Sequence, residues 1–587
     1  MLYRLFFCIL FLLINYSTAT SQIVYSFGAD SNDVVSNIVV DKFGNVYMAA
    51  NFCNTITIDK NVAKKITSTN HSQDILLAKF NSFGKLIWAN KIGGIGKDEI
   101  HDLKIDANGY LYLVGYFSKD CVFENAAKKI NLSSHGAADG FIVKILSTTG
   151  NIDWVNQLGG EGADDICSVT IDKADGVVVS GRFSKIMDAD ISEQQHLLIT
   201  KATEKNYSSA FIARYNAYDG KYIYANTMGI ENDNPSFQSQ SCVVSDEKNN
   251  CFFISTFTNS VDINPNGNAI NISSNGKNDL VLIKYDVNGK LLESVVLGGE
   301  GNENCNNKCL AINKKNELIF AISFQNECSI RNQNLAVKYS AIAETDLLLA
   351  KTNNKLSEML FAKPISDNGM MNCNQIIVDD ENNISIVGYT KKRVVNSSNK
   401  MNKQIVKPTL SQNLYNSYFY VLANNIGDVL LKKFNNNTSE NCSIHSIQSN
   451  LFSKDIWLAG NFNNTFAWQN AIFKSNGKKD FFLVKLKSDL TVWKLLKEDT
   501  TNRLTDENFV VDVKSNQQST LLNTKYMVNN SSPINLALYD YKGNKIKQML
   551  NDKQPLGLQQ IFFDISFLPA GLYFLKLNGK MKYCMKN

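Results

Sequence analysis

The chain has 587 residues, of which 44% are hydrophobic and 20% charged, a composition that is ordinary for globular proteins. Its 60 basic and 55 acidic residues give a net charge of +5 and are scattered along the chain, which argues against a nucleic-acid-binding protein. Only five histidines are present, and the chain contains neither a G-x-S-x-G nor an H-E-x-x-H motif.

The N-terminus has the features of a secretory signal peptide. Arg4 precedes an apolar stretch, residues 5–14, which is too short to span a bilayer because a spanning helix needs about 20 residues. Small residues follow, so we predict a signal peptide at residues 1–21 that is cleaved after Ala19 or Ser21. Cys8 lies inside the apolar stretch rather than after it, which argues against a lipoprotein anchor. No other segment is apolar enough to span a membrane, so we expect the mature protein to lie outside the cytoplasm.

A block of about 67 residues recurs between residues 22 and 497. One marker is an apolar run broken by a polar turn, and its turns start near Asp41, Asp106, Asp172, Asp246, Asn313, Asp379 and Asn450. A second marker is an apolar run that starts near Asp74, Asp139, Ser209, Asp279, Asp346, Ser417 and Asp480. Both markers therefore occur seven times, and a period in this range indicates a propeller or a solenoid.

Each block predicts four short strands. Both halves are rich in β-branched and aromatic residues around a glycine or asparagine turn, which is typical of a β-hairpin. Radial repetition of such four-stranded sheets gives a propeller, so we predict an all-β chain whose main part is a seven-bladed β-propeller. A linear β-solenoid is the alternative. We expect few helices, and an extra loop or small hairpin at the blade rim between Phe117 and Asp139.

The order of the markers at the two ends predicts how the ring closes. The chain enters the repeat at a second hairpin, residues 38–50, and leaves it at a first hairpin, residues 480–495. Neither hairpin can bury its faces alone. We therefore expect the N- and C-terminal half-blades to pair into one blade, which removes the exposed strand edges.

Glycine-rich loops with acidic residues recur at one end of successive blades. They contribute Asp98, Glu99, Asp164, Asp165 and Glu303, and we expect these side chains to form a ring around one mouth. Their oxygens could bind Ca²⁺ or a polar ligand there. The alternative, which we favour, is that glycine supplies a strained turn and the acid caps backbone N–H groups.

A second calcium candidate is the turn that contains Asp262, Asn264, Asn266 and Gly267. It matches the opening of a calcium-binding loop, but the twelfth position is Ser273 instead of the bidentate glutamate. We therefore favour a rim turn, and no other cofactor is indicated.

Twelve cysteines are present, and the eleven that remain without Cys8 cannot all pair. Buried free thiols are the favoured interpretation, with a disulfide or a metal site as alternatives. Because side chains alternate along a strand, Cys242, Cys309 and Cys373 should share one face and Cys167 should lie on the other.

Two tryptophans, Trp88 and Trp154, recur at near-equivalent positions of the block. This recurrence favours a place in the blade core over a role in stacking against sugars. The histidines lie at dissimilar positions, so we predict no catalytic residue. Scattered carboxylates of the kind that glycosidases use leave a carbohydrate-active enzyme as an alternative.

After a polar linker, residues 498–507, the chain predicts a small β-sandwich at residues 508–587. A Leu-Tyr539-Asp540 strand with Gly543 precedes a Leu-Pro569-Ala570-Gly571-Leu-Tyr573-Phe segment. Together they resemble the type A C-terminal sorting domain of the type IX secretion system of Bacteroidota, although the family's opening Pro-Asn-Pro is missing. The resemblance implies an Ig-like sandwich whose motif residues are read by that machinery. An ordinary accessory sandwich is the alternative.

The blades are similar to the SBBP-type β-propeller repeat of bacterial secreted proteins, in segments such as Leu158-Gly-Gly-Glu-Gly and the strand that starts at Ile105. This resemblance implies an extracellular protein and supplies no catalytic residue. We therefore expect a secreted or cell-surface monomer that binds a surface protein or a glycan without catalysis. A carbohydrate-active enzyme with funnel carboxylates and a structural surface-layer protein are the alternatives.

Overall fold

A computed structural model describes residues 24–28, 31–59, 64–125, 128–190, 192, 194–200, 208–231, 240–332, 336–367, 369–393, 414–434, 442–450, 455–468, 471–475, 478–486, 509–515, 520–528, 534–540, 544–552, 557–565, 567–569, 571–577 and 580–586. The chain divides into two compact units, residues 1–495 and 496–587. Over the described ranges every element is a β-strand except the 3₁₀ turn η1 (Thr69–His71), as the lack of a helical period predicts. No helix in these ranges is long and apolar enough to cross a membrane.

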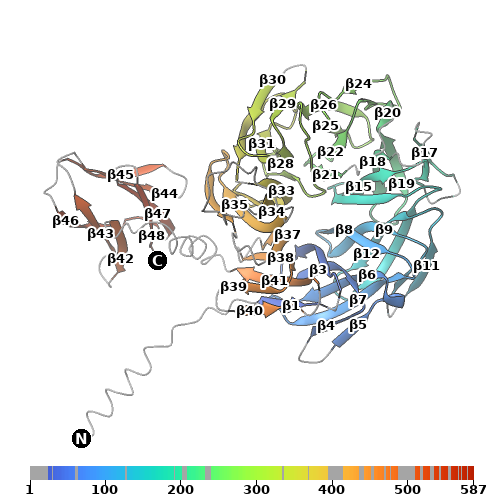
Figure 1. Ribbon diagram of the computed structural model, residues 1–587, viewed down its shortest axis with the longest axis horizontal. Helices are drawn as coiled ribbons and strands as arrows, with labels where there is room; N and C mark the ends of the chain where they lie inside the picture. Colours follow the sequence, from blue (N-terminus) through green and yellow to red (C-terminus); the bar gives the residue numbers. More distant parts are fainter. Residues whose placement is uncertain are drawn as a thin grey trace, which may run out of the picture. The chain divides into compact units, whose positions relative to one another are not determined.

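The main antiparallel sheets of the first unit are each built around four strands, which follow one another in the chain in every sheet except the last (Figure 1). Sheet I contains β2 (Val34–Val40), β3 (Val46–Cys53), β6 (Gln73–Phe80) and β7 (Leu86–Gly94). Sheet II contains β8 (Asp98–Ile105), β9 (Tyr110–Phe117), β12 (Asp139–Leu146) and β13 (Asn151–Leu158). Sheet III contains β14 (Asp165–Ile171), β15 (Gly176–Phe183), β18 (Ser209–Asn216) and β19 (Tyr222–Thr227).

The later repeats form the same arrangement. Sheet IV contains β21 (Ser241–Ser245), β22 (Cys251–Phe257), β25 (Asp279–Tyr285) and β26 (Leu291–Gly298). Sheet V contains β27 (Leu310–Ile312), β28 (Leu318–Phe324), β31 (Asp346–Thr352) and β32 (Met359–Ile365). Sheet VI contains β33 (Met370–Val378), β34 (Ile384–Arg393), β35 (Leu414–Ala423) and β36 (Val429–Phe434). Sheet VII contains β37 (Cys442–Ser449), β38 (Ile456–Phe462), β41 (Asp480–Leu486) and β1 (Val24–Phe27).

The first strand of each sheet lies next to the first strands of its two neighbours. β2 contacts β8, β8 contacts β14, and the contacts continue through β21, β27, β33 and β37 back to β2. These strands therefore surround a common axis. Hydrophobic side chains fill the spaces between adjacent sheets, where one cluster joins Tyr112 of sheet II to Phe183 and Tyr215 of sheet III. The architecture is that of an all-β, propeller-like ring, as the repeat predicts.

The ends of the repeat share a sheet, but not in the expected proportion. β1 pairs with β41, so sheet VII takes its outer strand from the N-terminal end and its other three strands from the C-terminal end. The hairpin β2–β3, expected in the shared blade, instead pairs with β6 in sheet I. The expectation of two paired half-blades is therefore wrong. A short segment ahead of the first hairpin, residues 24–27, is enough to cover the edge of β41, and this segment does not belong to either marker of the repeat.

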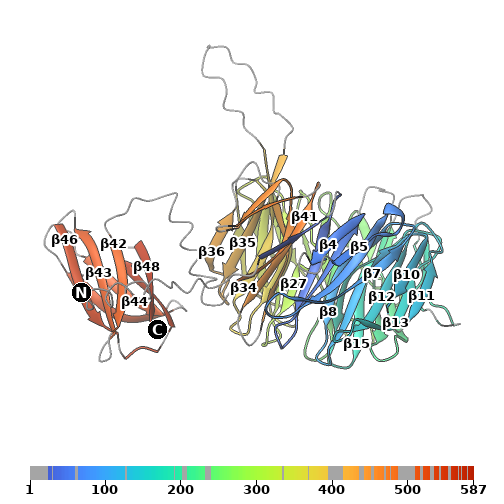
Figure 2. The same cartoon turned by 90° about the horizontal axis from the view of Figure 1, so that it is seen from below.

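Small accessory hairpins lie between the main hairpins of several repeats. The expected one contains β10 (Asp120–Glu124) and β11 (Lys129–Ser133), and β10 pairs with β7 of sheet I (Figure 2). β29 (Glu327–Arg331) and β30 (Ala336–Ser340) extend sheet IV through β26 in the same way. The others are β4 (Thr55–Asp59) with β5 (Lys64–Thr67), β16 (Ile186–Asp188) with β17 (Leu197–Ile199), β20 (Gly229–Glu231) with β23 (Ser260–Asp262) and β24 (Asn271–Ser273), and β39 (Thr465–Trp468) with β40 (Ala471–Lys474).

Local chemistry explains why each hairpin turns where it does. In the β2–β3 turn, Asp41 Oδ1 accepts hydrogen bonds from the backbone N–H groups of Phe43 and Asn45, and Gly44 has φ +80°. A short carboxylate side chain satisfies the turn donors, and glycine adopts the left-handed conformation without strain. The same pattern of bonds recurs at Asp172, Asp246, Asp286, Asn313 and Asp379.

Buried or partly buried basic side chains join adjacent sheets. Lys79 of β6 donates to the Ser147 carbonyl of sheet II, and Lys485 of β41 donates to the Ser82 carbonyl of sheet I. The second bond links the last sheet to the first. Equivalent bonds run from Lys284 to Asn354 and from Lys351 to Asn425.

The second unit contains two antiparallel sheets. One contains β42 (Phe509–Ser515), β43 (Thr520–Val528) and β46 (Gly557–Asp564). The other contains β45 (Lys545–Asp552), β44 (Ile534–Asp540), β47 (Gly571–Leu577) and β48 (Lys580–Lys586). Leu522 of the first sheet packs in one apolar cluster with Leu536 and Leu575 of the second, so the two sheets share a core.

Candidate functional site

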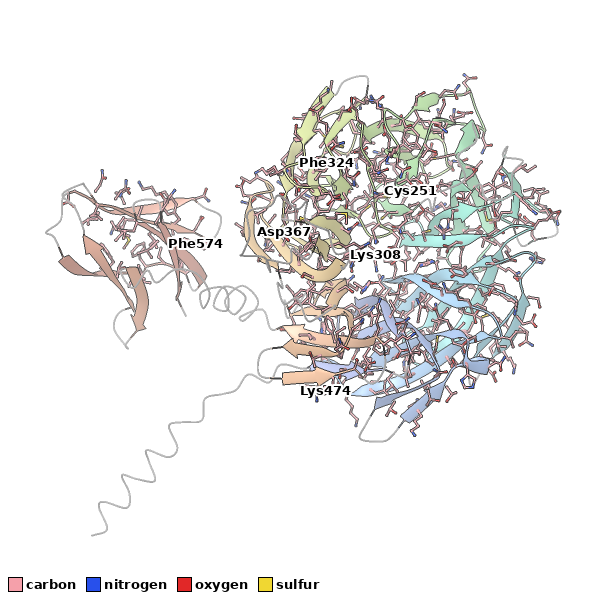
Figure 3. All side chains as sticks on the ribbon, in the orientation of Figure 1. Cys251, Lys308, Phe324, Asp367, Lys474 and Phe574 are labelled. Atoms are coloured by element: carbon pink, nitrogen blue, oxygen red, sulfur yellow. The ribbon has the colours of Figure 1, made fainter. Side chains whose placement is uncertain are left out.

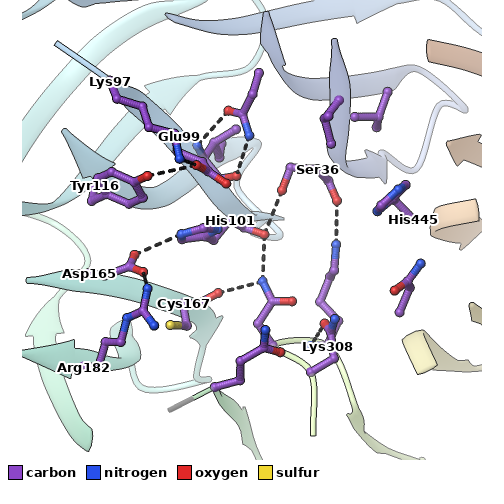
Figure 4. Close-up of a pocket in the computed structure, with 18 residues that line it drawn as sticks. Ser36, Lys97, Glu99, His101, Tyr116, Asp165, Cys167, Arg182, Lys308 and His445 are labelled. Carbon is purple, nitrogen blue, oxygen red and sulfur yellow. Dashed lines mark hydrogen bonds and ion pairs between the residues drawn. The ribbon is translucent and has the colours of Figure 1, made fainter. Parts of the chain in front are cut away.

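The inner strands of sheets I to III, VI and VII line a cavity of about 360 Å³ at the axis of the first unit. Figure 4 shows its side chains converging from several sheets. The lining contains three basic residues, Lys97, Arg182 and Lys308, and two acidic ones, Glu99 and Asp165. The remaining lining residues are Val34, Val35, Ser36, Asn51, Ile100, His101, Tyr116, Cys167, Gln240, Asn306, Asn307, Asn374 and His445.

β-bulges aim five of these side chains at the cavity. In each of β2, β8, β14, β33 and β37 the pairing register with the next strand skips one residue. A bulged residue is left unpaired and its side chain is redirected. The skipped residues are Ser36, His101, Cys167, Asn374 and His445, and all five line the cavity.

Two cross-strand pairs carry the charge at this site. Glu99 lies opposite Tyr116, whose hydroxyl donates to Glu99 Oε2 over 3.0 Å, and Lys97 Nζ lies 2.6 Å from the same oxygen. Asp165 lies opposite Arg182, whose Nη2 lies 3.0 Å from Asp165 Oδ2. Each carboxylate is thus neutralised by a basic residue of its own sheet.

His101 connects these pairs across the boundary between sheets II and III. Its Nε2 lies 3.0 Å from Asp165 Oδ1, and neither atom has another hydrogen-bond partner among the described residues. Burial disfavours the charged imidazole, but Asp165 and Glu99 outweigh burial and raise the pKa of His101. Burial likewise opposes ionisation of Asp165, but His101 and Arg182 outweigh it and lower the pKa of Asp165.

The pKa of Glu99 is also lowered, because His101 and Lys97 outweigh the effect of its burial. The thiol of Cys167 behaves oppositely, since burial and then Asp165 raise its pKa. A buried thiol with a raised pKa is a poor nucleophile. The cluster is therefore a set of mutually paired ions beside an inert thiol.

A segment of sheet V crosses the axis beneath this cluster. Asn307 Nδ2 donates to the carbonyl oxygens of His101 and Cys167, each over 2.9 Å. Lys308 Nζ donates to the Ser36 carbonyl over 2.5 Å. All three acceptors belong to bulged residues, whose carbonyls the strand ladders leave available. β27 starts only at Leu310, so the preceding residues are free to leave the strand and form the floor of the cavity.

A second cavity of about 390 Å³ adjoins the first and shares Gln240, Asn306 and Asn374 with it. Its other lining residues are Thr256, Asn304, Cys305, Ala321, Ser323, Asn372, Cys373 and Tyr389. None of these residues is a lysine, arginine, aspartate or glutamate. The charged lining residues therefore come from sheets II and III and from Lys308 of sheet V, whereas the described lining from sheets IV and VI is neutral.

A belt of hydrogen-bonded side chains supports the cavity, and five of its six members lie one residue beyond a bulge. It runs through Gln375, Ser446, Asn37, Asp102, Ser168 and Cys242, one from each of six inner strands. Asp102 Oδ2 also accepts from the Val169 backbone N–H over 3.0 Å, so the side chain of one sheet binds the backbone of the next. This belt fixes the spacing of the inner strands at the axis.

The structure separates the predicted acidic ring into two groups. Glu99 and Asp165 line the cavity, whereas Asp98, Asp164 and Glu303 do not. The latter three are fully buried and accept from the backbone N–H groups of Gly94, Gly160 and Gly299 respectively. Burial raises the pKa of Asp98 to about 7 and that of Asp164 and Glu303 to about 8. The expectation that all five ring one mouth is wrong, because alternate residues of a strand point in opposite directions.

Close packing, not a left-handed turn, requires these glycines. A Cβ on Gly94 would lie 1.6 Å from the Asp120 carbonyl oxygen, and one on Gly299 would lie 1.7 Å from that of Glu327. The accessory hairpin of the next repeat passes at that point.

The second calcium candidate is a rim turn. Asp262 Oδ1 accepts from the backbone N–H groups of Asn264 and Ile270, and Asn266 Nδ2 donates to Asn226 Oδ1. Asp262 Oδ1 is thus used by two backbone N–H groups of the turn, as is usual for aspartate in a turn. In the described part of the chain no group of three or more His, Cys, Asp and Glu residues could hold a metal ion.

The ten cysteines whose side chains the structure describes are free thiols. Cys242 and Cys309 lie side by side, as predicted, and Cys167 faces the cavity. Cys373 differs from the prediction because the bulge at Asn374 breaks the alternation, and it lines the second cavity. Trp154 is buried in the apolar cluster between sheets II and III, as predicted, and the partly buried Trp88 packs against another cluster. Each donates its indole N–H to a backbone carbonyl of the next sheet, Trp88 to Ser147 and Trp154 to Ala217.

The motif residues of the second unit lie on two paired strands. Tyr539 and Asp540 end β44, and Asp540 pairs with Tyr573 of β47. The buried Tyr573 donates its hydroxyl to the Pro569 carbonyl over 2.7 Å, and β47 starts at Gly571. Gly543 and Ala570 lie outside the described residues.

Sequence reasoning missed His101, Tyr116, Arg182, Asn307 and Lys308. One signal could have found the last two. At residues 304–309 the run Asn-Cys-Asn-Asn-Lys-Cys replaces the apolar alternation that other copies have in their inner strand. Because only one copy of the repeat has polar residues at this position, the repeat does not explain them. They are explained by function or by local contacts.

Comparison with known proteins adds little. No family model matches the chain, and no curated protein sequence does. Among solved structures, the chain is similar to an acylaminoacyl peptidase of Pyrococcus horikoshii with a TM-score of 0.34 and 8% sequence identity, over 85% of this chain and 59% of that chain. The alignment thus spans less than two thirds of the peptidase.

Proposed function

We propose that the protein is a non-enzymatic binding module, a seven-bladed β-propeller that holds a surface protein or a glycan at one mouth of its axial channel. The observation that carries this proposal is the cavity at the axis, where the charged side chains come from sheets II and III and, with Lys308, from the crossing segment of sheet V. Residues that recur with the block are explained by the fold, whereas His101, Arg182 and Lys308 occur once each at their positions.

The protonation states favour binding over hydrolysis. Glycoside hydrolases need one carboxylic acid with a raised pKa beside a carboxylate. The two carboxyls that line the cavity, Glu99 and Asp165, both have lowered pKa values. The described carboxyls with strongly raised pKa values, such as Asp164, are buried beneath the loops and do not line the cavity.

The blade count rests on the contacts of the inner strands, which run from β2 around to β37 and back. We further propose that the second unit is an Ig-like sandwich that acts as a type A sorting domain. The pairing of Asp540 with Tyr573 supports this, because it places the two halves of the sorting motif on adjacent strands. Together with the signal peptide, this predicts export through the periplasm and the type IX machinery to the cell surface or the medium, as expected of SBBP-type repeat proteins.

The binding proposal is tested by screening the mature full-length chain against arrays of glycans and surface proteins. Arg182→Gln should abolish capture of the ligand found, whereas Lys42→Gln, a charge change on an exposed turn, should not. Release of new reducing ends from a captured glycan would instead establish a carbohydrate-active enzyme.

The export proposal is tested by deleting residues 508–587. The truncated protein should accumulate in the periplasm, as measured by fractionation and surface proteolysis. Unchanged surface display would contradict the sorting assignment and would leave the binding proposal intact.

A further inference from the structure

Lys308 is a buried cation at the axis without a counter-ion. It is 7% exposed, lines the cavity, and Figure 3 places it near the centre of the first unit. Its Nζ donates to the Ser36 carbonyl, and it forms no ion pair with any described carboxylate. An ammonium group has three N–H donors, so this one bond leaves donor capacity at the floor of the cavity.

The other charged groups at the cavity are already paired. Lys97 forms an ion pair with Glu99, and Arg182 forms one with Asp165. Lys308 therefore gives the described lining an excess of positive charge. Burying an uncompensated charge is costly, and the cost is relieved either by loss of the proton or by an anion that enters the site.

The groups that face Lys308 come from several inner strands. Burial lowers its pKa to about 8, Asp102 acts in the opposite direction, and Lys104 lowers it further. The thiols of Cys242 and Cys373 also act on the Lys308 ammonium. His445 lines the same cavity and is affected by the charge of Lys308 (Figure 4). Burial, with a further contribution from Lys308, lowers the pKa of His445 to about 3, so this imidazole is neutral at pH 7. Asp102 is occupied by the hydrogen-bond belt and by Lys104.

Amide side chains with unused hydrogen-bonding atoms line the same cavity as the ammonium. The Oδ1 atoms of Asn307 and Asn374, Nδ2 of Asn306 and the side-chain amide of Gln240 have no partner among the described residues. Amides offer donors and acceptors that match hydroxyl groups. The cavity of about 360 Å³ also has room for one small polar ligand.

We propose that this cavity binds an acidic sugar, with its carboxylate on the Lys308 ammonium and its hydroxyls on the surrounding amides. This inference rests on the proposed binding function and names its ligand class. None of the five acidic loop residues that the sequence predicted as ligand candidates contacts the acidic sugar in this proposal.

The test titrates the mature full-length protein with D-glucuronate, D-glucose and acetate at pH 7, with binding measured by calorimetry. Glucuronate should bind at least about tenfold more tightly than glucose, since a charge-assisted hydrogen bond contributes that much or more. Acetate should bind more weakly than glucuronate, because it lacks hydroxyls. Equal binding of glucuronate and glucose, or of glucuronate and acetate, would overturn the inference.

Variants then assign the preference to one residue. Lys308→Gln should bind glucuronate and glucose alike, Lys308→Arg should retain the preference, and the surface control Lys42→Gln should match the wild type. A preference that survives in a folded Lys308→Gln protein would overturn the inference.

The wild type provides a test that does not depend on the folding of a variant. Because Lys308 holds its proton below about pH 8, glucuronate affinity should fall about tenfold or more between pH 7 and 9.5, while glucose binding should not change. A flat profile would contradict the role of the ammonium. If the arrays identify a ligand but glucuronate does not bind, this inference fails and the binding function stands.

Discussion

The side-chain nitrogen of Asn307 lies 2.9 Å from the carbonyl oxygen of His101, although the two residues are 206 positions apart in the chain. The same nitrogen donates to Cys167 of the next sheet. One amide of sheet V therefore holds the inner strands of sheets II and III from across the axis.

Replacing Asn307 with alanine should destabilise the first unit by about 1–3 kcal/mol, because two partly buried carbonyls lose their donor. Thermal or denaturant unfolding of the full chain measures the change. Asn266→Ala, which removes an exposed amide of a rim turn, should cost much less. Equal effects of the two substitutions would show that the crossing segment does not brace the strands.

Asp102→Ala should be among the most destabilising single substitutions, at about 3 kcal/mol. The fully buried carboxylate accepts hydrogen bonds from Asn37, Ser168 and the Val169 backbone N–H, and the substitution removes this acceptor from all three donors. Denaturant unfolding measures the loss. Asp219→Ala on an exposed turn is the matched control, and a similar stability of both variants would exclude a structural role for the belt.

Because the pKa of Asp164 is raised in the folded protein, the free energy of unfolding should fall as the pH rises. The unfolded chain releases this proton near pH 3.8, but the folded protein holds it to about pH 8, so the contribution is full below pH 4 and is lost between pH 4 and 8. Asp164→Asn should therefore flatten the profile between pH 5 and 8 by about 1 kcal/mol or more. The midpoint of urea unfolding across this pH range measures the effect, and an unchanged slope would contradict the raised pKa.

Tyr573→Phe removes the hydroxyl that binds the Pro569 carbonyl, and it should cost the second unit about 1 kcal/mol. Hydrogen exchange of β44 and β47 in the full chain reports this locally. Tyr539→Phe provides the comparison within the same sheet. If the hydroxyl of Tyr573 acts only in the turn, protection of the first unit should not change.

The parts of the fold that could be predicted are those with local causes. The turn at Asp41 needs a short acceptor side chain and a glycine within five residues, and both are visible in the sequence. The accessory hairpin β10–β11 follows equally from a short apolar alternation. The pairing of β1 with β41 could not be predicted, because four residues outside the repeat carry no periodic signal.

The site was harder to predict for a related reason. A β-bulge adds one residue without changing composition, so nothing in the sequence distinguished His101 from a residue that faces a neighbouring sheet. The acidic loop residues were found, but alternation along the strand divides them. Asp98 points into the loop and Glu99 points into the cavity.

The strand β1 sets a limit on the order of folding. Because it covers β41, sheet VII has an uncovered edge until almost the whole first unit has been synthesised. Contacts between such distant segments form slowly, since the entropy of closing the intervening chain must be overcome first. A nascent chain that lacks residues 480–486 therefore keeps an open edge strand, which is a target for chaperones and proteases. Completion of the last sheet is the step that ends this exposure.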